Sequence, residues 1–276
     1  MSRDWLFVRI PNPLRNNQNE DHSSRVLSTA VADLAGHLRL ADPEGNWQFR
    51  RPDRSAGSNL GLWFHSTHEV LEELERRLRA HTAAHNWPVI TDRYDPPTAK
   101  YRTSQTIRLA DRLATESSEF ALRLLQDGGP RPEERLPLAT LHLWHLCALM
   151  APADRAAFLF HFWQFGTDDL GPAGRVQLAA EADGYAATLL SSPPEVDGQV
   201  WERYVPAVRS VIGGRQDTGV PVNYLLYDHA QLTHDRLGIP TATAALGARA
   251  LRGVLAAGAT LPAFTAEART LVLQSV

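Results

Sequence analysis

Lysine, cysteine and methionine are almost missing from this chain, which has one lysine, one cysteine and two methionines among 276 residues. A single cysteine excludes an intrachain disulfide framework. Because Cys147 lies in the apolar run Leu141–Cys147, it is typical of a buried, inert thiol rather than of a nucleophile. The many arginines do not make the chain basic. Its formal net charge of −3 argues against a nucleic-acid partner bound by phosphate neutralisation.

Long hydrophobic runs and nucleotide-binding motifs are missing as well. Residues Met1–Trp5 do not lead into a signal-peptide segment, and the longest apolar runs are shorter than a membrane span. We therefore expect a cytoplasmic protein with no membrane partner. The sequence has no GxxxxGKS/T, no GxGxxG after a strand, no GxSxG and no HExxH. Nucleotide-binding, nicotinamide, serine-hydrolase and zinc-protease functions thus lack support, and we expect no cofactor and no metal site.

What is present is the composition of a soluble globular protein, with 43% apolar and 21% charged residues. The first third predicts the order β-α-β-β-α-β, which is the split βαβ order of ferredoxin-like domains. Strands are expected at residues 5–10, 46–50, 59–65 and 87–94, and helices at 23–40 and 67–81.

After Pro97 the pattern becomes helical, with apolar residues three and four apart between stretches rich in glycine and proline. Helices are expected at residues 104–126, 138–150, 153–165, 175–190, 199–212, 221–237 and 241–257. We predict an α+β chain with a single fold, in which residues 1–96 form a small sheet with two helices and residues 97–276 form a helical part.

Two apolar segments of the helical part contain candidate sites that also have plain structural interpretations. His142 and His145 lie three residues apart on one helical face. Zinc needs a further protein ligand, so hydrogen-bonded packing histidines are favoured. The run Phe158–Phe165 is apolar on nearly every side, which favours a central core helix over the wall of a peptide groove.

The segment 222–236 is a stronger candidate for chemistry. On a helix, Tyr224, Tyr227 and Gln231 fall near one face, whereas His229 and Arg236 fall near another. Polar, titratable residues at the spacing of core positions break the usual pattern, and such breaks tend to mark functional sites. A polar helix end with a partly buried tyrosine would give the same pattern.

Three segments carry a family resemblance: residues 94–103 (YDPPTAKYRT), 59–64 (NLGLWF) and 229–238 (HAQLTHDRLG). The first resembles the signature Tyr-x-Pro-Glu-x-x-Arg-Tyr-Gly-Gly of lantibiotic dehydratase C-terminal domains, which carry out glutamate elimination in lanthipeptide and thiopeptide biosynthesis. The second resembles the family strand His-Leu-Arg-Leu-Arg-Phe. The third resembles His-x-x-x-Asn-Arg-Leu-Gly when Arg236 is aligned with the arginine.

Each segment departs from the family at charged or titratable positions. Pro97 stands where the family has a glutamate and Lys100 where it has an arginine; Gly61 and Trp63 replace two arginines, and Gln231 replaces the histidine. Most of the remaining motif positions match the family, whereas the groups that would hold a glutamyl carboxylate are replaced. This profile resembles that of the thiopeptide pyridine synthases, which perform a formal (4+2) cycloaddition on a dehydrated peptide.

That resemblance implies a substrate and a reaction. The substrate would be a dehydrated, azole-containing precursor peptide with its leader, and dehydratase proteins would be partners. Two dehydroalanines would close a ring, which then loses water and the leader peptide to become a pyridine. These steps need no metal or nucleotide, but they need proximity and positioned proton donors.

The resemblance also implies residue roles. We expect Tyr224, before Tyr101, to be the proton donor, with Gln231 orienting an amide and His229 or His234 as an alternative acid or base. Tyr101, Tyr224 and Gln231 would line one cleft between the sheet edge and the helix from Pro221. Trp63 would offer a flat wall to azole rings. The expected substrate-binding residues are Trp63, Lys100, Arg102, Asn223, Tyr227 and Arg236.

Leader binding is expected at an arginine cluster. Leaders of such precursors are commonly acidic and amphipathic, and Arg50, Arg51 and Arg54 lie beside a predicted exposed strand. An ordinary solvated cluster would look the same.

Two other functions remain open. The chain would be a split elimination enzyme if Arg102 and His229 or His234 replace the lost groups, and it would then act on glutamylated Ser or Thr. It would be a non-catalytic scaffold if it only carries precursor peptide to a dehydratase.

Overall fold

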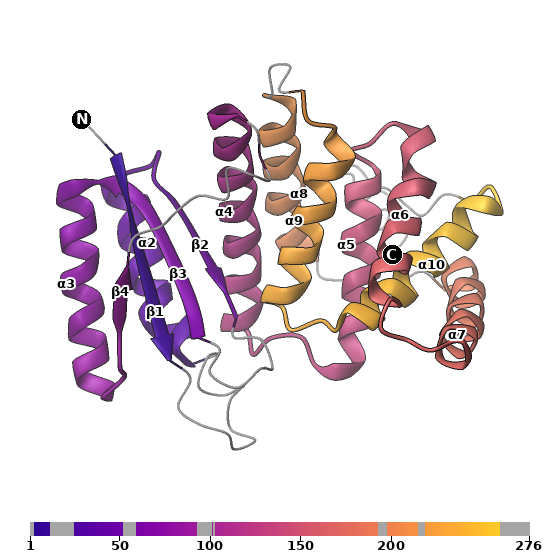
Figure 1. The fold of residues 1–276 in the computed structure, drawn as a ribbon, viewed down its shortest axis with the longest axis horizontal. Coiled ribbons are helices and arrows are strands. Elements are labelled where there is room, and N and C mark those ends of the chain that lie inside the picture. The colour runs from indigo at the N-terminus through magenta and orange to yellow at the C-terminus, as the bar shows by residue number, and fades with distance from the viewer. Residues whose placement is uncertain are drawn as a thin grey trace, which may run out of the picture. The chain divides into compact units, whose positions relative to one another are not determined.

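The fold is that of a computed structural model, which describes residues 3–11, 25–51, 59–92, 101, 103–192, 198–214 and 219–259 (Figure 1). The chain divides into two compact units. The first consists of Met1–Gly129 and Asp235–Leu237, and the second of Pro130–His234 and Gly238–Val276. The long helix after Pro97 therefore belongs to the unit that contains the sheet.

The first unit is built on a four-stranded antiparallel sheet with the strand order β2-β3-β1-β4. Its strands are β1 (Arg3–Pro11), β2 (Asn46–Arg50), β3 (Asn59–Thr67) and β4 (Ile90–Asp92). Alternate residues of β1 and β3 are buried, among them Val8, Leu62 and Phe64. Helix α3 (His68–His85) packs on both strands. The predicted βαββαβ order is confirmed.

The helix predicted at 67–81 runs on to His85, and two further elements differ from their predicted bounds. The helix expected at 23–40 contains a π-helical turn, η1 (Leu27–Val31), before α2 (Ala32–Ala41). The fourth strand begins at Ile90 rather than at Trp87, because Trp87 is held at the end of α3. Its main-chain N–H donates to the Thr82 carbonyl at 2.9 Å, and its ring stacks on His85 at 4.5 Å.

Polar contacts tie α2 to the sheet and to α3. Asp42 follows α2 and accepts hydrogen bonds from Arg3 at 2.7 and 2.8 Å and from Ser66 at 2.6 Å. Burial acts to raise the pKa of Asp42, but these hydrogen bonds outweigh burial and lower the pKa below its ordinary value. A charged pair thereby joins β1 to the end of α2.

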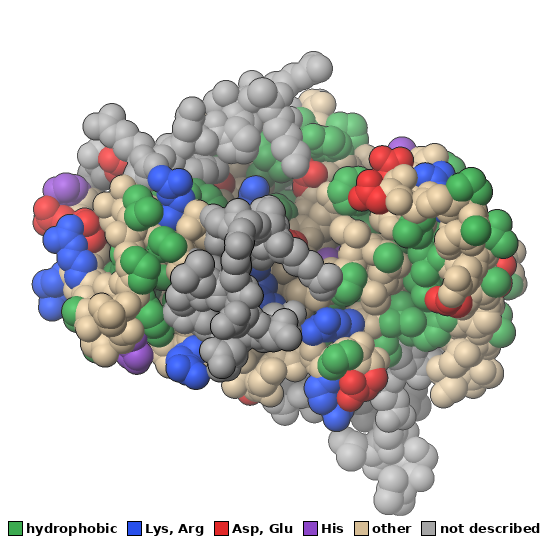
Figure 2. Space-filling model, turned by 60° about the horizontal axis from the view of Figure 1, so that its bottom comes forward, with side chains coloured by type: hydrophobic (Ala, Val, Ile, Leu, Met, Phe, Trp, Pro, Cys, Tyr) green, Lys and Arg blue, Asp and Glu red, His purple; other side chains and the backbone are tan. Residues whose placement is uncertain are grey.

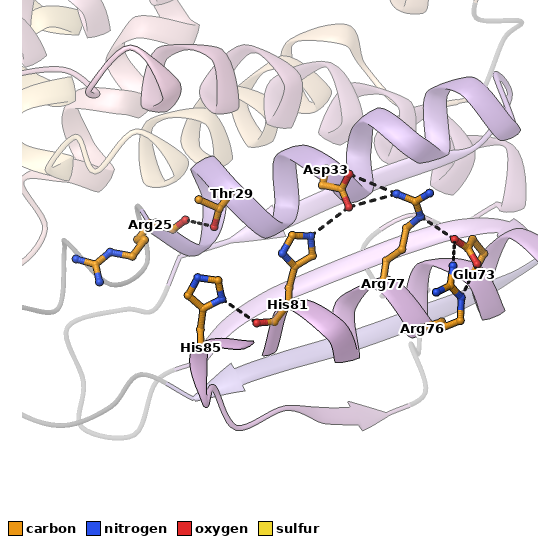
Figure 3. A network of polar contacts seen from close by, with 8 residues as sticks. All are labelled: Arg25, Thr29, Asp33, Glu73, Arg76, Arg77, His81 and His85. Carbon is orange, nitrogen blue, oxygen red and sulfur yellow. Dashed lines mark hydrogen bonds and ion pairs between the residues drawn. The ribbon is translucent and has the colours of Figure 1, made fainter. Parts of the chain in front are cut away.

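The outer surfaces of α2 and α3 share a second polar network (Figure 3). Asp33 of α2 accepts from His81 at 3.1 Å and forms an ion pair with Arg77 at 3.4 Å. The hydrogen bond with His81 is the main reason that the pKa of Asp33 is lowered. Glu73 joins the network through Arg76 and Arg77. These groups are solvent-exposed, so the network contributes little to stability.

Helix α4 (Ser104–Gln126) covers the outer edge of β2 (Figure 1). It begins where predicted because the Thr103 hydroxyl accepts from the Thr106 N–H at 3.1 Å. Two hydroxyls of α4 then accept main-chain hydrogen bonds from the edge strand: Thr115 from Trp47 at 3.1 Å and Ser118 from Phe49 at 3.3 Å. An unpaired strand edge is a liability that proteins usually cover, and α4 covers this one with side chains.

The second unit is helical. Its longer helices are α5 (Arg135–Cys147), α6 (Pro152–Gly166), α7 (Pro172–Ser191), α8 (Gly198–Gly213), α9 (Val222–Arg236) and α10 (Thr241–Ala256), of which the last residues of α9 belong to the first unit. All begin and end within three residues of the predicted bounds. Helix α10 packs against α5, α6 and α7. It approaches α5 closely, since a Cβ on Gly247 would lie 2.6 Å from the Thr140 hydroxyl.

Helix α6 is buried on one side only. Phe158, Leu159 and Phe162 are buried, whereas Phe160 is 37% and Phe165 is 55% exposed. The expectation of a core helix apolar on every side was wrong for these two phenylalanines. The guanidinium of Arg252 lies 4.9 Å from the Phe160 ring, so Phe160 is partly shielded by a cation.

The surface carries charge of both signs. Where described residues are visible in Figure 2, blue and red side chains are interspersed rather than sorted by sign, in keeping with a net charge of −3. None of the helices in the described ranges combines the length and the apolar character that crossing a membrane requires.

Candidate functional site

An aromatic surface lies on β3 in the first unit. Trp63 stacks on Phe7 of β1, directly opposite in the register, with ring centroids 4.5 Å apart and 16° between the planes. The indole leans along β3 over Gly61, where a Cβ would lie 2.6 Å from its ring. The guanidinium of Arg50 lies 5.9 Å from the Trp63 ring. Gly61 and Trp63 therefore fit each other, and together with Phe7 they form a half-buried aromatic surface beside a cation.

The other predicted residues of the first unit are only partly described. Arg50 is exposed at the end of β2, Arg51 is half-buried, and Tyr101 is buried. Arg54, Lys100 and Arg102 lie outside the described residues, so their roles remain predictions.

The predicted catalytic cleft also remains a prediction. Tyr101 belongs to the first unit, whereas Tyr224 and Gln231 belong to the second.

Arg236 has a described environment. It is fully buried and donates to the Phe49 carbonyl at 2.8 Å, to the Ser117 hydroxyl at 2.7 Å and to Gln48 at 3.4 Å. The first two acceptors belong to β2 and α4, so Arg236 joins the end of α9 to the sheet unit. Its predicted contact with substrate remains untested.

The exposed side of α9 pairs two of the predicted residues. Gln231 Nε2 donates to the Tyr227 hydroxyl at 2.7 Å, as expected for side chains four residues apart on a helix. Tyr224 lies one turn earlier and is 40% exposed. The Asn223 side chain accepts from the Tyr224 main-chain N–H at 2.9 Å, so it stabilises the first turn of the helix. Gln231 thus orients Tyr227, and its predicted contact with a substrate amide stays a prediction.

Tyr227 lies among aromatic side chains of α6. The closest is Phe162, with ring centroids 4.7 Å apart; Phe158, His161 and Phe165 lie at 6.5, 6.4 and 6.4 Å. Burial, with a smaller effect of the Asp228 charge, raises the pKa of Tyr227 to about 12. The phenol is therefore protonated at neutral pH.

A buried chain of three imidazoles and one phenol lies deeper in the second unit. His142 of α5 binds the Tyr204 hydroxyl of α8 through Nε2 at 2.7 Å and His234 of α9 through Nδ1 at 3.1 Å. The same Tyr204 hydroxyl binds His229 Nε2 at 2.6 Å. Each of the four residues is at most 5% exposed. The two predicted acid or base candidates of α9 are thus the ends of one hydrogen-bonded chain.

The chain has two possible proton orders. The Tyr204 hydroxyl has one hydrogen and lies between two ring nitrogens, so it donates to one imidazole and accepts from the other. If the hydroxyl donates to His142, then His142 donates to His234; if it accepts from His142, then His234 donates to His142. Burial lowers the pKa of His142 well below its ordinary value and that of His234 to about 3. His142 and His234 are therefore uncharged at neutral pH, and each carries its proton on a neutral ring.

Sequence reasoning missed two residues. Tyr204 carries no motif, and the only signal was a polar group at a core position, three residues after Trp201 on the same helix. Asp111 of α4 was also missed. Burial raises its pKa to about 7, and the signal was an acid one turn after Ile107 in an amphipathic helix.

No metal-ligand set was found within the described ranges, where no three His, Cys, Asp or Glu residues gather closely enough to hold an ion. The packing interpretation of His142 is confirmed, since both of its ring nitrogens are hydrogen-bonded. His145 lies 4.8 Å from the Trp201 ring. Burial raises the pKa of the Cys147 thiol to about 12, as expected for an inert thiol.

Comparison with known families gives one match across most of the chain. The model described as "Lantibiotic biosynthesis dehydratase C-term" matches residues 5–255. No curated protein matches the chain.

Two solved structures share the fold. One is the tRNA-dependent lantibiotic dehydratase MibB from Microbispora sp. 107891, with 18% identity and a TM-score of 0.62 over 92% of this chain. The other is TsrL, with 16% identity and a TM-score of 0.63 over 92% of this chain. The alignment spans 28% of MibB and 95% of TsrL. At these identities the likeness is one of fold.

Proposed function

Because the chain belongs to the family of lantibiotic dehydratase C-terminal domains, we propose that it is a pyridine synthase of thiopeptide biosynthesis. In this proposal it joins two dehydroalanines of a leader-bearing, azole-containing precursor peptide by a formal (4+2) cycloaddition. Loss of water and of the leader then gives the pyridine. Precursor peptide and dehydratase proteins are the proposed partners.

The observation that carries the proposal is the surface of β3. The resembling elimination strand has two arginines where this chain has Gly61 and Trp63, and the Trp63 indole occupies the space over Gly61. Arginine pairs strongly with carboxylates, so their loss removes a means of holding a glutamyl group. A tryptophan stacked on Phe7 suits flat azole rings instead.

The reaction asks for positioning and proton transfer. One dehydroalanine and the preceding amide, as its hydroxyl tautomer, form the azadiene, and the second dehydroalanine adds across it. Holding both residues of one peptide together supplies up to about 7–11 kcal/mol in well-oriented cases. A positioned acid adds about 10²–10⁴-fold. The protonated Tyr227 phenol and the Gln231 amide are groups of the kind that these steps need. His229 and His234 are buried and would act through other groups.

The test is turnover of a synthetic peptide that carries a leader, azoles and two dehydroalanines. Mass spectrometry should show a cyclised product that has lost water, together with the leader released as a carboxamide. A peptide that is bound but stays unchanged contradicts the proposal and supports a scaffold.

The elimination enzyme is the second candidate, favoured by the shared fold with MibB. A glutamylated seryl peptide, offered in parallel, tests it. Release of glutamate with formation of dehydroalanine would replace the first proposal, because cycloaddition requires finished dehydroalanines.

Leader binding at Arg50, Arg51 and Arg54 is part of the proposal. The combined variant Arg50→Glu, Arg51→Glu and Arg54→Glu should bind an acidic leader peptide more weakly, and its affinity should depend less on salt, since the screened attraction is gone. Isothermal titration calorimetry at two salt concentrations measures both effects. Unchanged affinity would place the leader elsewhere.

A further inference from the structure

Tyr227 has a hydroxyl with one fixed neighbour. Gln231 Nε2 donates to its oxygen at 2.7 Å, and this bond fills an acceptor position while the phenol keeps its own hydrogen. Among the described residues, no acceptor for that hydrogen lies within bonding distance. The geometry therefore leaves the Tyr227 proton available to a ligand.

The surroundings of Tyr227 are open on one side. Phe162 is buried behind the ring, whereas Phe165 is 55% exposed and His161 is also exposed. Aromatic side chains at such spacings accept a further planar ring by stacking or by edge contact. Tyr224, by contrast, is exposed and has no ring contact with any of the described residues. Of the two tyrosines on this face of α9, only Tyr227 combines a hydroxyl with an aromatic wall.

The electrostatic setting keeps the phenol protonated but makes it a weak acid, so the transfer needs a group that stabilises the phenolate. A phenol whose ionisation is opposed by burial and by the Asp228 charge keeps its proton through the neutral range. As the proton leaves, the Gln231 N–H stabilises the charge that develops on the phenol oxygen. The amide thereby helps the transfer without exchanging a proton itself.

We infer that Tyr227 is the catalytic residue that gives a proton to the substrate, with Gln231 as its positioning residue and Phe162 and Phe165 as the wall for a planar azole ring. This inference rests on the proposed function. The Tyr227 O–H bond breaks as the ring hydroxyl leaves as water, and the electron pair of the C–O bond goes with that oxygen. A ring C–H gives up a proton to solvent, which restores the phenol. In the second loss the ring C–N bond breaks with its electron pair on the leader nitrogen, Tyr227 gives that nitrogen a proton, and another ring C–H releases its proton to solvent, which in turn reprotonates the phenolate.

The first test compares two tyrosines of the second unit. Tyr227→Phe removes only the hydroxyl, so pyridine formation should fall by about 10²–10⁴-fold while peptide affinity stays within twofold. The matched control is Tyr185→Phe on α7, a half-buried tyrosine whose hydroxyl bonds Thr140; its turnover should stay within twofold. If Tyr227→Phe stays within a few-fold of the parent while Tyr224→Phe collapses turnover, the donor assignment is overturned and the proposed function stands.

The positioning role of Gln231 has its own signature. Gln231→Leu should lower kcat with little change in KM, because the amide acts only as the proton moves. Gln231→His returns an N–H donor and should recover part of kcat. A rise in KM with unchanged kcat would mean that Gln231 holds the peptide instead.

A binding measurement separates this site from the reaction. The probe is an azole-containing peptide with alanine at both dehydroalanine positions, titrated by calorimetry. Phe165→Ala should weaken its binding about tenfold, whereas Phe160→Ala, an exposed phenylalanine of the same helix, should not. Equal effects of the two variants would overturn the ring-binding wall.

The binding result stands apart from turnover. A parent protein that forms no pyridine contradicts the proposed function and with it the donor role, yet a selective loss in Phe165→Ala would still support the aromatic site.

Discussion

The most buried polar cluster of each unit is held in a different way. In the first unit the buried Arg236 and Glu119 are held by hydrogen bonds or an opposite charge; Glu119 accepts from Trp47 at 2.7 Å and pairs with Arg39. The second buries neutral rings, linked through His142 and Tyr204. A buried charge fixes geometry but is costly to unpair. A neutral chain keeps its protons movable, but it cannot become charged without losing stability.

The largest expected effect comes from removing the buried guanidinium. Arg236→Met removes the hydrogen bonds to the Phe49 carbonyl and to the Ser117 hydroxyl, and losing the partner of a buried polar group costs about 1–3 kcal/mol. We expect a loss of about 3 kcal/mol, seen as faster hydrogen exchange in β2 and α4. Arg249→Met is the control, because Arg249 pairs with Asp183 at the surface and should cost less than about 1 kcal/mol. Equal losses would contradict the contrast between the units.

Acid should destabilise the second unit. Its folded state holds the pKa of His145 at about 4 and that of His234 at about 3, with His142 also lowered. The unfolded chain binds protons near pH 6.5. Stability is therefore complete above about pH 6.5 and is lost as the pH falls, by roughly 1.4 kcal/mol per pH unit for each histidine. Hydrogen exchange in α5 and α9 between pH 7 and 5 measures this loss.

A single substitution sharpens that prediction. His145→Gln removes one titrating ring, so one proton fewer is taken up on unfolding. The slope of stability against pH should therefore fall by roughly 1.4 kcal/mol per pH unit. Tyr204, Trp201, His229 and Phe162 pack near His142 or His234, and they remain in the variant. An unchanged slope would show that His145 is not buried in solution.

Asp111 should make a contribution to the stability of the first unit that decreases as the pH rises, opposite to the contribution of the histidines in the second unit. Burial raises its pKa from an ordinary 3.8 to about 7, so the folded state keeps a proton that the unfolded chain has already released. Stability is then lost as the pH rises from about 4 to about 7, by at most roughly 1.4 kcal/mol per unit. Asp111→Asn should abolish this loss in α4, again followed by hydrogen exchange. A variant that is less stable at pH 7.5 would contradict the assignment.

The smallest effect is expected at the surface network of α2 and α3. Asp33→Asn removes the ion pair with Arg77 and the contact with His81, both of them solvent-exposed. Thermal unfolding should change by about 0.2–1 kcal/mol at low salt and by less at high salt. A loss as large as that of Arg236→Met would show that exposure does not decide the value of a charge here.

The elements of this fold follow from local patterns, whereas its buried polar chain does not. The bounds of α4 were readable because Thr103 is a capping residue and Gly128–Gly129 follow the helix with positive φ. The start of β4 was predicted three residues too early. The Trp87 N–H bonds the Thr82 carbonyl at the end of α3, and this bond outweighs the strand propensity of Trp87. Tyr204 and His142 lie 62 positions apart in the sequence, and a local sequence pattern cannot predict a contact between residues so far apart.

Helical spacing also limited the prediction of the site. Tyr224, Tyr227 and Gln231 share a face in any helix, so the sequence indicates the face but not the pair. Which tyrosine pairs with Gln231 depends on which one packs against α6, and the helical pattern of α9 alone does not determine that packing. The identity of Trp63 and Gly61 could be read directly, yet the way in which the indole uses the space of the missing Cβ required the structure.

The covered edge of β2 has a consequence for peptide recognition. An extended peptide often binds by adding itself as a further strand, with main-chain hydrogen bonds that ignore its sequence. The N–H groups of Trp47 and Phe49 and the Phe49 carbonyl are already taken by Thr115, Ser118 and Arg236, so a peptide cannot add to this edge at these positions without displacing α4. A peptide that binds beside β2 must therefore be recognised by its side chains. Such recognition selects particular sequences, whereas strand addition would bind many unfolded chains. The same closure prevents two copies of the protein from joining strand to strand through β2.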